Sequence, residues 1–372
     1  MAQVDKIYHE ILEDVLKNGT KKSDRTGTGT LSVFGRQVRF DLTNNKLPII
    51  TTKKIHTKGV IEELFWFLRG ETNIKSLVDK GVNIWVGDAY KNYCKYTSAN
   101  SSEYNEWMRD NGDDTLSMYT ELQFIEKIKT DNDFANKWGE LGPIYGKQWK
   151  QWQGWMEYGN EGKSGSIWYD QIGILITQLK TNPDSRRLMV NAWNVADLDK
   201  MILPPCHYGF QCWTRELERE ERINWILLNH FEGGMEKGIA MNWTDEIINS
   251  PKFNCPNRAL TLMWNQRSWD LALGAPYNIL SYAILSHILA NECNMIAEEL
   301  ICSVGDAHIY LNQIEPIKEQ LLRDVNQYGD SLIEINKNTT IHQYSVGLPM
   351  TPEDIIIKNY ESYPTIKMKL SN

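Results

Sequence analysis

The apolar residues change their spacing from helical to strand-like within the first part of the chain. From Ile7 to Val15 they recur at helical spacing, and the segment ends near Gly19, as expected for a helix with a glycine stop. Residues Leu31 to Leu42, LSVFGRQVRFDL, alternate as a strand does. The chain therefore mixes helices and strands from its beginning, which permits an α+β fold.

The same mixture continues along the chain, without an internal repeat or a low-complexity tract. Apolar periodicity predicts helices at 57–70, 122–128, 171–179 and 277–290, and strands at 187–193 and 259–264. Two polar stretches, from about 91 to 137 and from about 216 to 258, interrupt this pattern and are predicted to be surface insertions.

Composition excludes several classes of protein. With 372 residues, 41% of them hydrophobic and 24% charged, the chain can build a large core and is not disordered. It has no apolar stretch long enough to span a bilayer and no signal-like N-terminus, so we expect an intracellular protein. The net charge of −8 argues against broad nucleic-acid binding, and an anionic substrate would need a local cluster of arginines.

The cysteines and histidines suggest no metal site. The six cysteines lie far apart without a CxxC pair, so neither a zinc cluster nor a disulfide scaffold is expected, and the thiols should be reduced. The seven histidines show no ligand spacing.

Cys206 is the first candidate for a reactive group. It lies in Leu203-Pro204-Pro205-Cys206-His207, where two prolines fix the backbone that enters the cysteine. The adjacent histidine would suit a thiol held rigidly in a cleft and partly activated as thiolate. Taken alone, the pentapeptide also fits a buried structural cysteine after a proline turn.

Several arginines occur in settings that suit a phosphate group. Arg186 and Arg187 stand at a turn that leads into a strand, Arg267 is followed by Ser268, and Arg25 opens the loop RTGTG. A guanidinium binds phosphate bidentately. Singly, each arginine is equally an ordinary surface charge, and the loop lacks the Gly-Lys-Ser/Thr ending of a Walker P-loop.

Taken in order, these motifs resemble the thymidylate synthase family along nearly the whole chain outside the two insertions. Some bacterial members also carry the first insertion, whereas the last two motifs are closer to eukaryotic members. The motifs are DRTGTGT (24–30), EELFWFLRGETN (62–73), LGPIYGKQW (141–149), NPDSRRLMVNAWN (182–194), LPPCH (203–207), NQRSWDLALGAPYNI (265–279), GDAHIYLN (305–312) and PTIKM (364–368).

The resemblance implies a fold and a reaction. The fold would be α+β, with a mainly antiparallel, kinked sheet packed by helices, in one catalytic domain over 1–372 that pairs sheet to sheet as a homodimer. Cys206 would add to C6 of a pyrimidine nucleotide, so that C5 can attack the one-carbon unit of the co-substrate 5,10-methylenetetrahydrofolate.

The resemblance also assigns site residues. The catalytic group would be Cys206, Glu63, Asp270, Tyr145 and His207; the dUMP contacts would be Arg25, Gln266, Arg267, Ser268, Asn278, His308 and Tyr310, with Arg186 and Arg187 supplied by the other subunit; the folate contacts would be Trp85, Asp270 and Gly274. Within this set, His308 and Tyr310 would bind the 3′-hydroxyl of a deoxyribose.

Two of these residues also have a physical rationale. Glu63 is followed by apolar residues, and a carboxylate near an apolar wall has the raised pKa that proton transfer requires; in solvent it would be an ordinary helix-face charge. The amide of Asn278 can donate to O4 of uracil while accepting from N3–H, whereas family members that act on dCMP carry aspartate there. Asparagine therefore favours dUMP.

The chain departs from the family pattern near the folate half and the C-terminal lid. After PTIKM it ends in Lys369-Leu370-Ser371-Asn372, with a polar amide where valine or isoleucine is usual. A lid that seals less well would let water reach the C5 methylene before hydride does, which gives 5-hydroxymethyl-dUMP. The other departures are Val86, Cys212, Asn265, Trp269 and Tyr277.

This distribution favours a dUMP hydroxymethylase, with thymidylate synthase as the alternative. Such hydroxymethylases are associated with viruses that use modified pyrimidines, and the Lys, Asn and Ile richness fits an AT-rich genome, so we expect a virus-encoded, cytoplasmic enzyme without membrane or specific nucleic-acid partners. A non-catalytic nucleotide- or RNA-binding relative is a third hypothesis. The joint presence of Cys206, Glu63, Asp270 and Asn278 argues against it, because binding alone needs no nucleophile.

Overall fold

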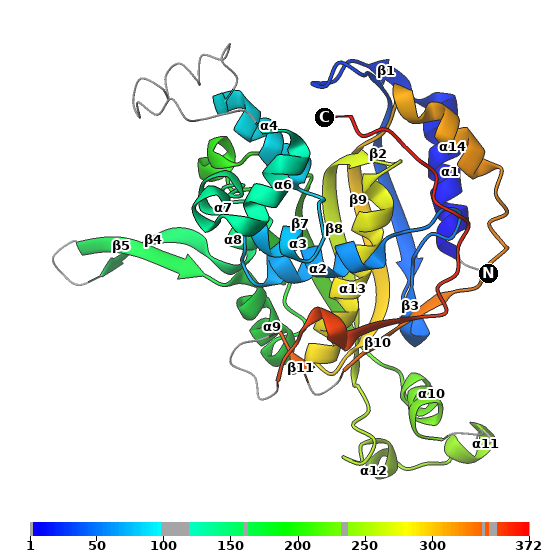
Figure 1. Ribbon diagram of the computed structural model, residues 1–372. Coiled ribbons are helices and arrows are strands. Elements are labelled where there is room, and N and C mark those ends of the chain that lie inside the picture. Colours follow the sequence, from blue (N-terminus) through cyan, green and yellow to red (C-terminus); the bar gives the residue numbers. More distant parts are fainter. Residues whose placement is uncertain are drawn as a thin grey trace.

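A computed structural model describes residues 3–97, 119–158, 163–231, 237–336, 339–341 and 348–371. One six-stranded sheet forms its centre, and helices pack against it (Figure 1). Only β8 and β9 pair in parallel within this sheet. The structure therefore confirms the predicted α+β fold with a mainly antiparallel sheet. In spatial order the strands are β1 (Thr20–Lys22), β2 (Thr30–Asp41), β9 (Ile296–Tyr310), β8 (Arg258–Asp270), β7 (His207–Glu216) and β6 (Met189–Asn191).

The strand ends of the central sheet define two opposite rims. β7 begins at His207, which pairs with Gln266 near the end of β8, whereas Glu216 at the end of β7 pairs with Arg258. β8 and β9 therefore end at the rim where β7 and β2 begin. A register shift between His207 and Gly209 bends β7 at this rim.

Burial explains the long helices. α13 (Gly274–Glu292) is apolar on nearly every side and its middle is fully buried, as expected for a helix that crosses the core between the sheet and α2. α2 (Thr57–Leu68) buries a continuous run from Leu64 to Leu68. The other helices are α1 (Gln3–Asn18), α3 (Lys75–Asp79), α4 (Val86–Thr97), α6 (Glu121–Thr130), α7 (Asn132–Trp138), α8 (Tyr145–Lys150), α9 (Gln171–Thr181), α10 (Arg219–His230), α11 (Lys237–Ala240), α12 (Asp245–Ile248) and α14 (Ile314–Leu321).

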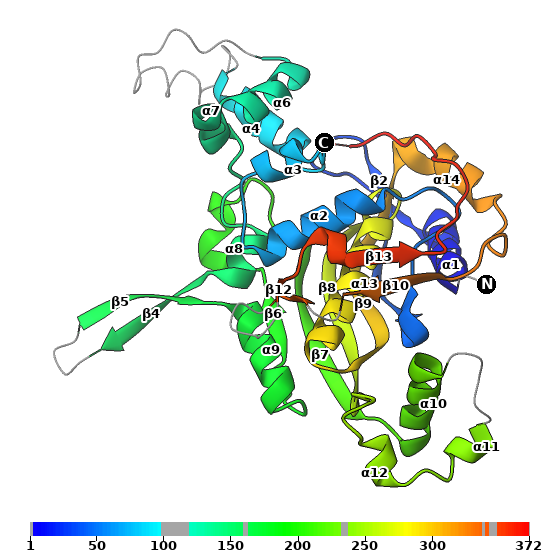
Figure 2. The same ribbon diagram turned by 60° about the horizontal axis from the view of Figure 1, so that its bottom comes forward.

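Two features project from the body. β4 (Trp152–Tyr158) and β5 (Lys163–Tyr169) form a two-stranded hairpin, and α10 to α12 extend beyond the ends of β7 and β8 (Figures 1 and 2). The remaining short elements are β3 (Lys46–Leu47), β10 (Ser331–Ile335), β11 (Thr339–Thr340), β12 (Leu348–Pro349), β13 (Ile355–Lys358), η1 (Thr43–Asn45), η2 (Val195–Lys200), η3 (Leu311–Gln313) and η4 (Pro352–Asp354).

The predicted elements are present, with different lengths. The strand predicted at 259–264 continues to Asp270, and the strand predicted at 187–193 is reduced to β6. The helix predicted at 122–128 is part of α6; residues 98–118 of the same polar stretch lie outside the described residues. No helix of the described part is long and apolar enough to cross a membrane.

Trp264 fills the centre of the core, and its removal should be costly. It is fully buried and stacked on Tyr282, with ring centroids 5.1 Å apart. Trp264→Ala should lower the free energy of unfolding by about 3–5 kcal/mol because it leaves a large cavity. Trp155→Ala, at a site 72% exposed on the hairpin, should change it by no more than about 0.5 kcal/mol. Urea unfolding curves test this difference, and similar losses for both variants would contradict it.

Candidate active site

The candidate residues gather at the rim of the sheet where β7 begins and β8 and β9 end. His207 opens β7, Asp270 ends β8 and Tyr310 ends β9. α2 and α8 contribute Glu63 and Tyr145 from the helical side. Residues that lie far apart in the sequence are thereby brought to one end of the molecule.

Arg267 fixes the turn that carries Cys206. Its Nε donates to the carbonyl of Pro205 at 2.8 Å and its Nη2 donates to that of Pro204 at 2.9 Å, while its backbone N–H donates to the carbonyl of Cys206 at 2.9 Å. The backbone N–H of Cys206 donates to the hydroxyl of Tyr145 at 2.8 Å. The backbone at Cys206 is thus held by two elements, β8 through Arg267 and α8 through Tyr145.

Burial raises the pKa of the Cys206 thiol, and the positive charges of Arg267 and Arg25 oppose this shift. The histidine next to it does not act as a cation: burial lowers the pKa of His207 to about 3, and its Nδ1 lies 2.8 Å from the hydroxyl of Tyr282. An uncharged imidazole offers the Cys206 thiolate no positive charge. A neutral His207 stacks instead on the ring of Tyr145, with centroids 4.2 Å apart.

Glu63 is a half-buried residue of α2 and lies beside Trp85. The indole Nε1 of Trp85 donates to Oε1 of Glu63 at 2.8 Å. Burial raises the pKa of Glu63 to about 7, and the indole hydrogen bond opposes the shift. The predicted raised pKa is confirmed, and a carboxyl that titrates near neutrality can both take up and release a proton.

Asn278 faces Gln266 across the site. Nε2 of Gln266 lies 3.4 Å from Oδ1 of Asn278 and also donates to the carbonyl of Ser268 at 2.8 Å. The indole of Trp264 donates to Oε1 of Gln266 at 3.1 Å, which fixes the orientation of the Gln266 amide. This chain of contacts orients the Asn278 side chain from the core.

Asp270 forms the corner between β8 and α13. It accepts hydrogen bonds from the backbone N–H groups of Ala272 at 2.9 Å and Leu273 at 3.2 Å, and burial raises its pKa. A Cβ placed on Gly274 would lie 3.6 Å from the Asp270 side chain, an ordinary contact distance, so Gly274 lies directly beside Asp270. These contacts join two predicted folate contacts at one corner.

Lys53 is a site residue that no sequence pattern indicated. It is buried, burial lowers its pKa to about 8, and the nearby Asp270 opposes that shift. Its Nζ donates to the carbonyl of Ala272 and lies 3.6 Å from Sδ of Met368 in the C-terminal segment. A cation therefore stands between Asp270 and the tail.

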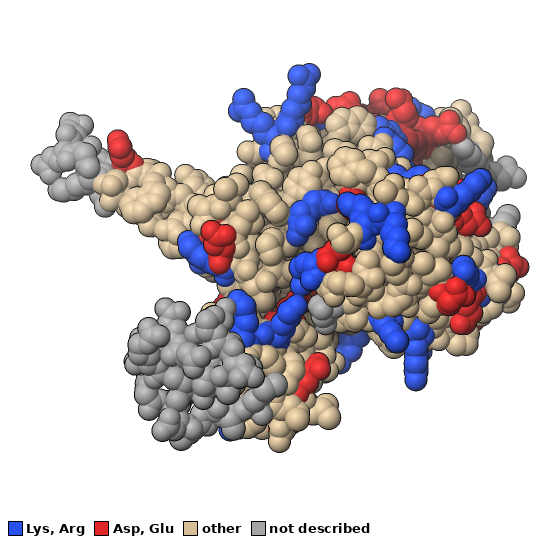
Figure 3. All heavy atoms as spheres, turned by 90° about the horizontal axis from the view of Figure 1, so that it is seen from above, with Lys and Arg blue, Asp and Glu red and all other residues tan. Residues whose placement is uncertain are grey.

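The loop that carries Arg25 is organised by Asp24. Its carboxylate accepts from the backbone N–H groups of Thr26 at 2.7 Å and Gly29 at 2.6 Å, and Gly27 and Gly29 adopt positive φ. The Arg25 side chain is exposed. Viewed from this end (Figure 3), lysine and arginine side chains lie around the middle of the surface. The local positive charge suits an anion on a chain that is acidic overall.

The predicted sugar contacts end β9. Nδ1 of His308 lies 3.2 Å from Oδ1 of Asp306, and that interaction lowers the pKa of Asp306. Burial raises the pKa of the Tyr310 phenol. The charge of Asp270 also raises the pKa of the Tyr310 phenol.

Arg186 and Arg187 are not part of this arrangement. They precede β6, the strand at one edge of the central sheet, and both are exposed. Neither forms an ion pair with another residue of the described ranges.

Asp88 is a second residue that the sequence analysis missed. It lies in the first turn of α4, three residues after Trp85, which directly precedes this helix. Asp88 is half-buried, and burial raises its pKa. The charge of Asp88 in turn raises the pKa of Cys206. The spacing from Trp85 could have revealed it.

The departures from the family motifs do not all face the site. Cys212 and Trp269 are fully buried members of the hydrophobic core, so their side chains are not exposed at the site. Val86 is also buried, whereas Asn265 and Tyr277 are half-buried. A hydrophobic core can repack around side chains of different volume, so Cys212 and Trp269 do not require a change in the reaction.

The polar end of the chain is bonded to η3. Nε2 of Gln313 donates to the carbonyl of Lys369 at 3.0 Å, and Nδ2 of Asn312 donates to Oγ of Ser371 at 3.1 Å. Asn372 lies outside the described residues. The tail is therefore packed against the rim that carries the site.

No three His, Cys, Asp or Glu side chains of the described residues are grouped in a way that could hold a metal ion.

Comparisons with known proteins agree with this geometry. A family model described as thymidylate synthase matches residues 6–372. A protein named thymidylate synthase from Mesoplasma florum is 38% identical over 361 residues, which cover 97% of this chain and 98% of its own length. A protein of the same name from Listeria monocytogenes is 37% identical over 371 residues, which cover 98% of this chain and 99% of its own length.

The buried carboxyl of Glu63 should make stability depend on pH. The pKa of Glu63 is about 7 in the folded chain, compared with the ordinary value of 4.5 expected in the unfolded chain. Between these two pH values the carboxyl ionises more readily in the unfolded chain, so raising the pH lowers the free energy of unfolding. Glu63→Gln should therefore gain stability relative to the unchanged chain as the pH rises from about 4.5 to 7, by up to about 3 kcal/mol. Urea unfolding at a series of pH values measures this.

Glu10→Gln, at an exposed carboxylate of α1, provides the control and should show no such gain. Stability curves for Glu63→Gln and the unchanged chain that run parallel from pH 4.5 to 8 would contradict the buried state of Glu63.

Proposed function

The chain belongs to the thymidylate synthase family, and we propose that it converts dUMP to dTMP with 5,10-methylenetetrahydrofolate as the second substrate. Family membership makes it a one-carbon transferase. The observation that supports the proposal is that Arg267 holds the carbonyls of Pro204 and Pro205 next to Cys206. Glu63 beside Trp85 and Asn278 beside Gln266 also support it. Residues 1–372 would form one catalytic domain, with insertions at about 91–137 and 216–258.

The proposed chemistry begins with the thiolate of Cys206. Its sulfur forms a bond to C6 of the uracil ring, and the electron pair displaced from the C5–C6 double bond makes C5 the nucleophile that bonds the one-carbon unit. Arg267 favours the thiolate by its charge, and burial keeps water away from it. Loss of the C5 proton and cleavage of the bond between the one-carbon unit and the folate nitrogen would leave a methylene group on C5. Hydride from tetrahydrofolate would then reduce this methylene to a methyl group while the C6–sulfur bond breaks, which frees the thiol and leaves dihydrofolate.

Glu63 would move the protons of this sequence. Its pKa of about 7 allows it to exchange a proton with an ordered water near O4 and C5 without a large energy cost. Tyr145 and neutral His207 hold the backbone and walls of this part of the site. Both are therefore expected to orient the reacting groups.

Asn278 would distinguish uracil from cytosine. With its amide oriented by Gln266, it can donate to O4 and accept from N3–H, and cytosine reverses both requirements. His308 and Tyr310 would bind the deoxyribose hydroxyl from the adjacent strand.

The folate supplies the one-carbon unit and the hydride, and the residues at the corner of the site fit it. The Asp270 carboxylate is an acceptor for ring N–H donors, Trp85 offers an aromatic wall, and Lys53 can interact with an anionic group. Gly274 leaves space at the start of α13.

The phosphate site would be completed by a second copy of the chain. Arg25, Arg267 and Ser268 can bind the 5′-phosphate from within one chain, whereas Arg186 and Arg187 are exposed and unpaired within the described residues. They stand beside an open face of the sheet with Met189 and Trp213 exposed by 45% and 57%. A homodimer that covers this face would bring these arginines to the other chain's phosphate.

The departures from the family motifs favoured a dUMP hydroxymethylase. The comparisons with known proteins favour a thymidylate synthase instead. The relatives reported above are bacterial and are named thymidylate synthase, so they do not support a viral hydroxymethylase. The hydrogen bonds of Lys369 and Ser371 to η3 also supply a way to close the site with a polar tail. Exclusion of water would then let hydride transfer complete the reaction.

The products distinguish these activities. Incubation with dUMP and methylenetetrahydrofolate should give dTMP and dihydrofolate in equal amounts, measured by mass spectrometry and absorbance. Cys206→Ala should abolish both products and the release of tritium from C5-labelled dUMP, whereas Cys293→Ala, at the far end of α13, should retain both. Hydroxymethyl-dUMP with tetrahydrofolate as the products would contradict the proposal.

A further inference from the structure

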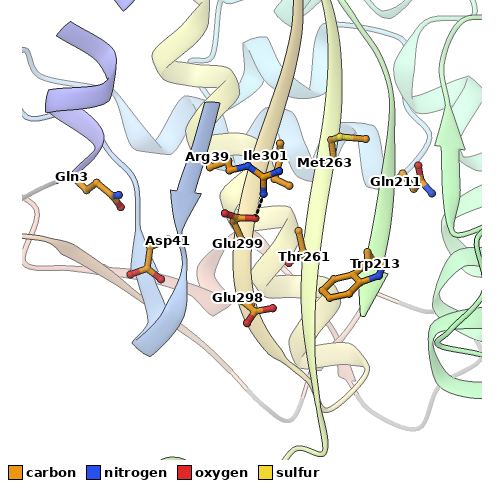
Figure 4. Close-up of a pocket in the computed structure, with 10 residues that line it drawn as sticks. All are labelled: Gln3, Arg39, Asp41, Gln211, Trp213, Thr261, Met263, Glu298, Glu299 and Ile301. Atoms are coloured by element: carbon orange, nitrogen blue, oxygen red, sulfur yellow. Dashed lines mark hydrogen bonds and ion pairs between the residues drawn. The ribbon is translucent and has the colours of Figure 1, made fainter. Parts of the chain in front are cut away.

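Tyr282 is a core residue that reaches the candidate site through one hydrogen bond. It lies in the middle of α13 and is fully buried, with its ring stacked on the indole of Trp264. Trp264 follows Met263 along β8, and Met263 lines a hollow on the opposite face of the sheet (Figure 4). Successive side chains of a strand point to opposite faces. The stack therefore fixes the Tyr282 ring on the face that α13 covers.

The hydroxyl of Tyr282 has one hydrogen-bond partner within the described ranges, Nδ1 of His207 at 2.8 Å. If Nδ1–H donated to the phenol oxygen, the phenol O–H would be left buried without an acceptor, which costs free energy. If the phenol O–H donates to Nδ1 instead, the hydrogen-bonding capacity of both groups is satisfied. The burial of Tyr282 therefore makes Nδ1 the acceptor.

The imidazole of His207 then carries its proton on Nε2. Burial alone lowers the pKa of His207 to about 3, so the neutral ring holds one proton. Nε2 has no hydrogen-bond partner in the described part of the chain. It is nevertheless not among the fully enclosed unpaired polar atoms of that part, in contrast to Nε2 of His9. Nε2–H of His207 is therefore accessible to a bound molecule or to water.

This N–H group belongs to the wall of the candidate site. His207 follows Cys206 directly, and its ring is stacked on that of Tyr145, which also holds the Cys206 backbone. When the Cys206 sulfur adds to C6 under the proposed function, negative charge builds on the pyrimidine carbonyl oxygen that is conjugated with C5. A donor whose direction is fixed in advance stabilises such a charge.

We propose that Tyr282 is a positioning residue, whose hydroxyl donates to Nδ1 of His207 and thereby holds Nε2–H as the donor for the oxygen of the reacting pyrimidine. The hydrogen bond made by one ring nitrogen of a histidine determines what the other nitrogen can do. The inference rests on the proposed function for the identity of the acceptor. The hydrogen bond and the tautomer are properties of the protein alone, and they give an uncharged histidine a role in the reaction.

The tautomer can be measured directly in the unchanged chain. With nitrogen-15 histidine incorporated, the NMR signals of the two ring nitrogens show which of them carries the proton, and His207→Asn identifies the signals of this residue by their absence. The inference predicts a proton on Nε2 and a hydrogen-bonded acceptor at Nδ1 near neutral pH. A proton on Nδ1 would overturn the inference, whatever the activity of the protein.

Tyr282→Phe removes the hydroxyl and keeps a ring that can stack on Trp264. It should lower kcat for dTMP formation about tenfold and leave KM for dUMP within about twofold, because the hydrogen bond supports charge that forms in the transition state. The Nδ1 signal of His207 should move to that of an acceptor without a hydrogen bond. The matched control is Tyr90→Phe in α4, where the lost hydroxyl donates to the carbonyl of Tyr119 at 2.9 Å; kcat and the His207 signals should both stay unchanged.

An unchanged kcat in Tyr282→Phe would overturn the positioning role while leaving the proposed function intact. An equal loss of kcat in Tyr90→Phe would also overturn it, since the effect would then follow from the loss of any phenol hydrogen bond. An unchanged chain that forms no dTMP would contradict the proposed function, and the spectrum of His207 would still decide whether Tyr282 fixes the tautomer.

Discussion

The contact between the Arg267 guanidinium and the two proline carbonyls is the constraint on which the site depends. Pro204 and Pro205 have no N–H to donate and precede β7, and their carbonyls accept from Arg267 of the neighbouring strand β8. Arg267 fills this role with two of its nitrogen atoms and keeps other N–H groups for an anion. The position of the Cys206 backbone is thereby tied to the register of β7 and β8. Under the proposed function, Arg267 would also bind the phosphate.

Burial determines the protonation states around that sulfur. It raises the pKa of Glu63 to about 7 and lowers that of His207 to about 3, so the carboxyl can exchange protons while the imidazole stays neutral. Burial also brings the pKa of Lys53 down to about 8, next to an Asp270 whose pKa is raised. The side chains of Glu63, Lys53 and Asp270 would be fully ionised at neutral pH in water. Burial at this rim of the sheet lets them exchange protons and form hydrogen bonds instead.

Much of this arrangement could be predicted from the sequence, for reasons that differ between residues. The helices α2 and α13 follow from apolar periodicity, and Cys206, Glu63 and Asn278 lie in motifs whose order identifies the family. The neutral state of His207 could not be predicted, since it depends on burial in the folded chain. Lys53 lacks a pattern of its own, and the burial of Cys212 and Trp269 depends on which face of a strand meets the core. The bonding of the tail to η3 is a tertiary contact across 56 residues or more.

The central claim is that the Cys206 sulfur bonds to C6 of the pyrimidine ring. The most direct measurement is the mass of the denatured protein after incubation with 5-fluoro-dUMP and methylenetetrahydrofolate, followed by peptide mapping. The account predicts a mass increase equal to both ligands, located on the peptide that contains Cys206. An unmodified protein, or an adduct on any other residue, would contradict it.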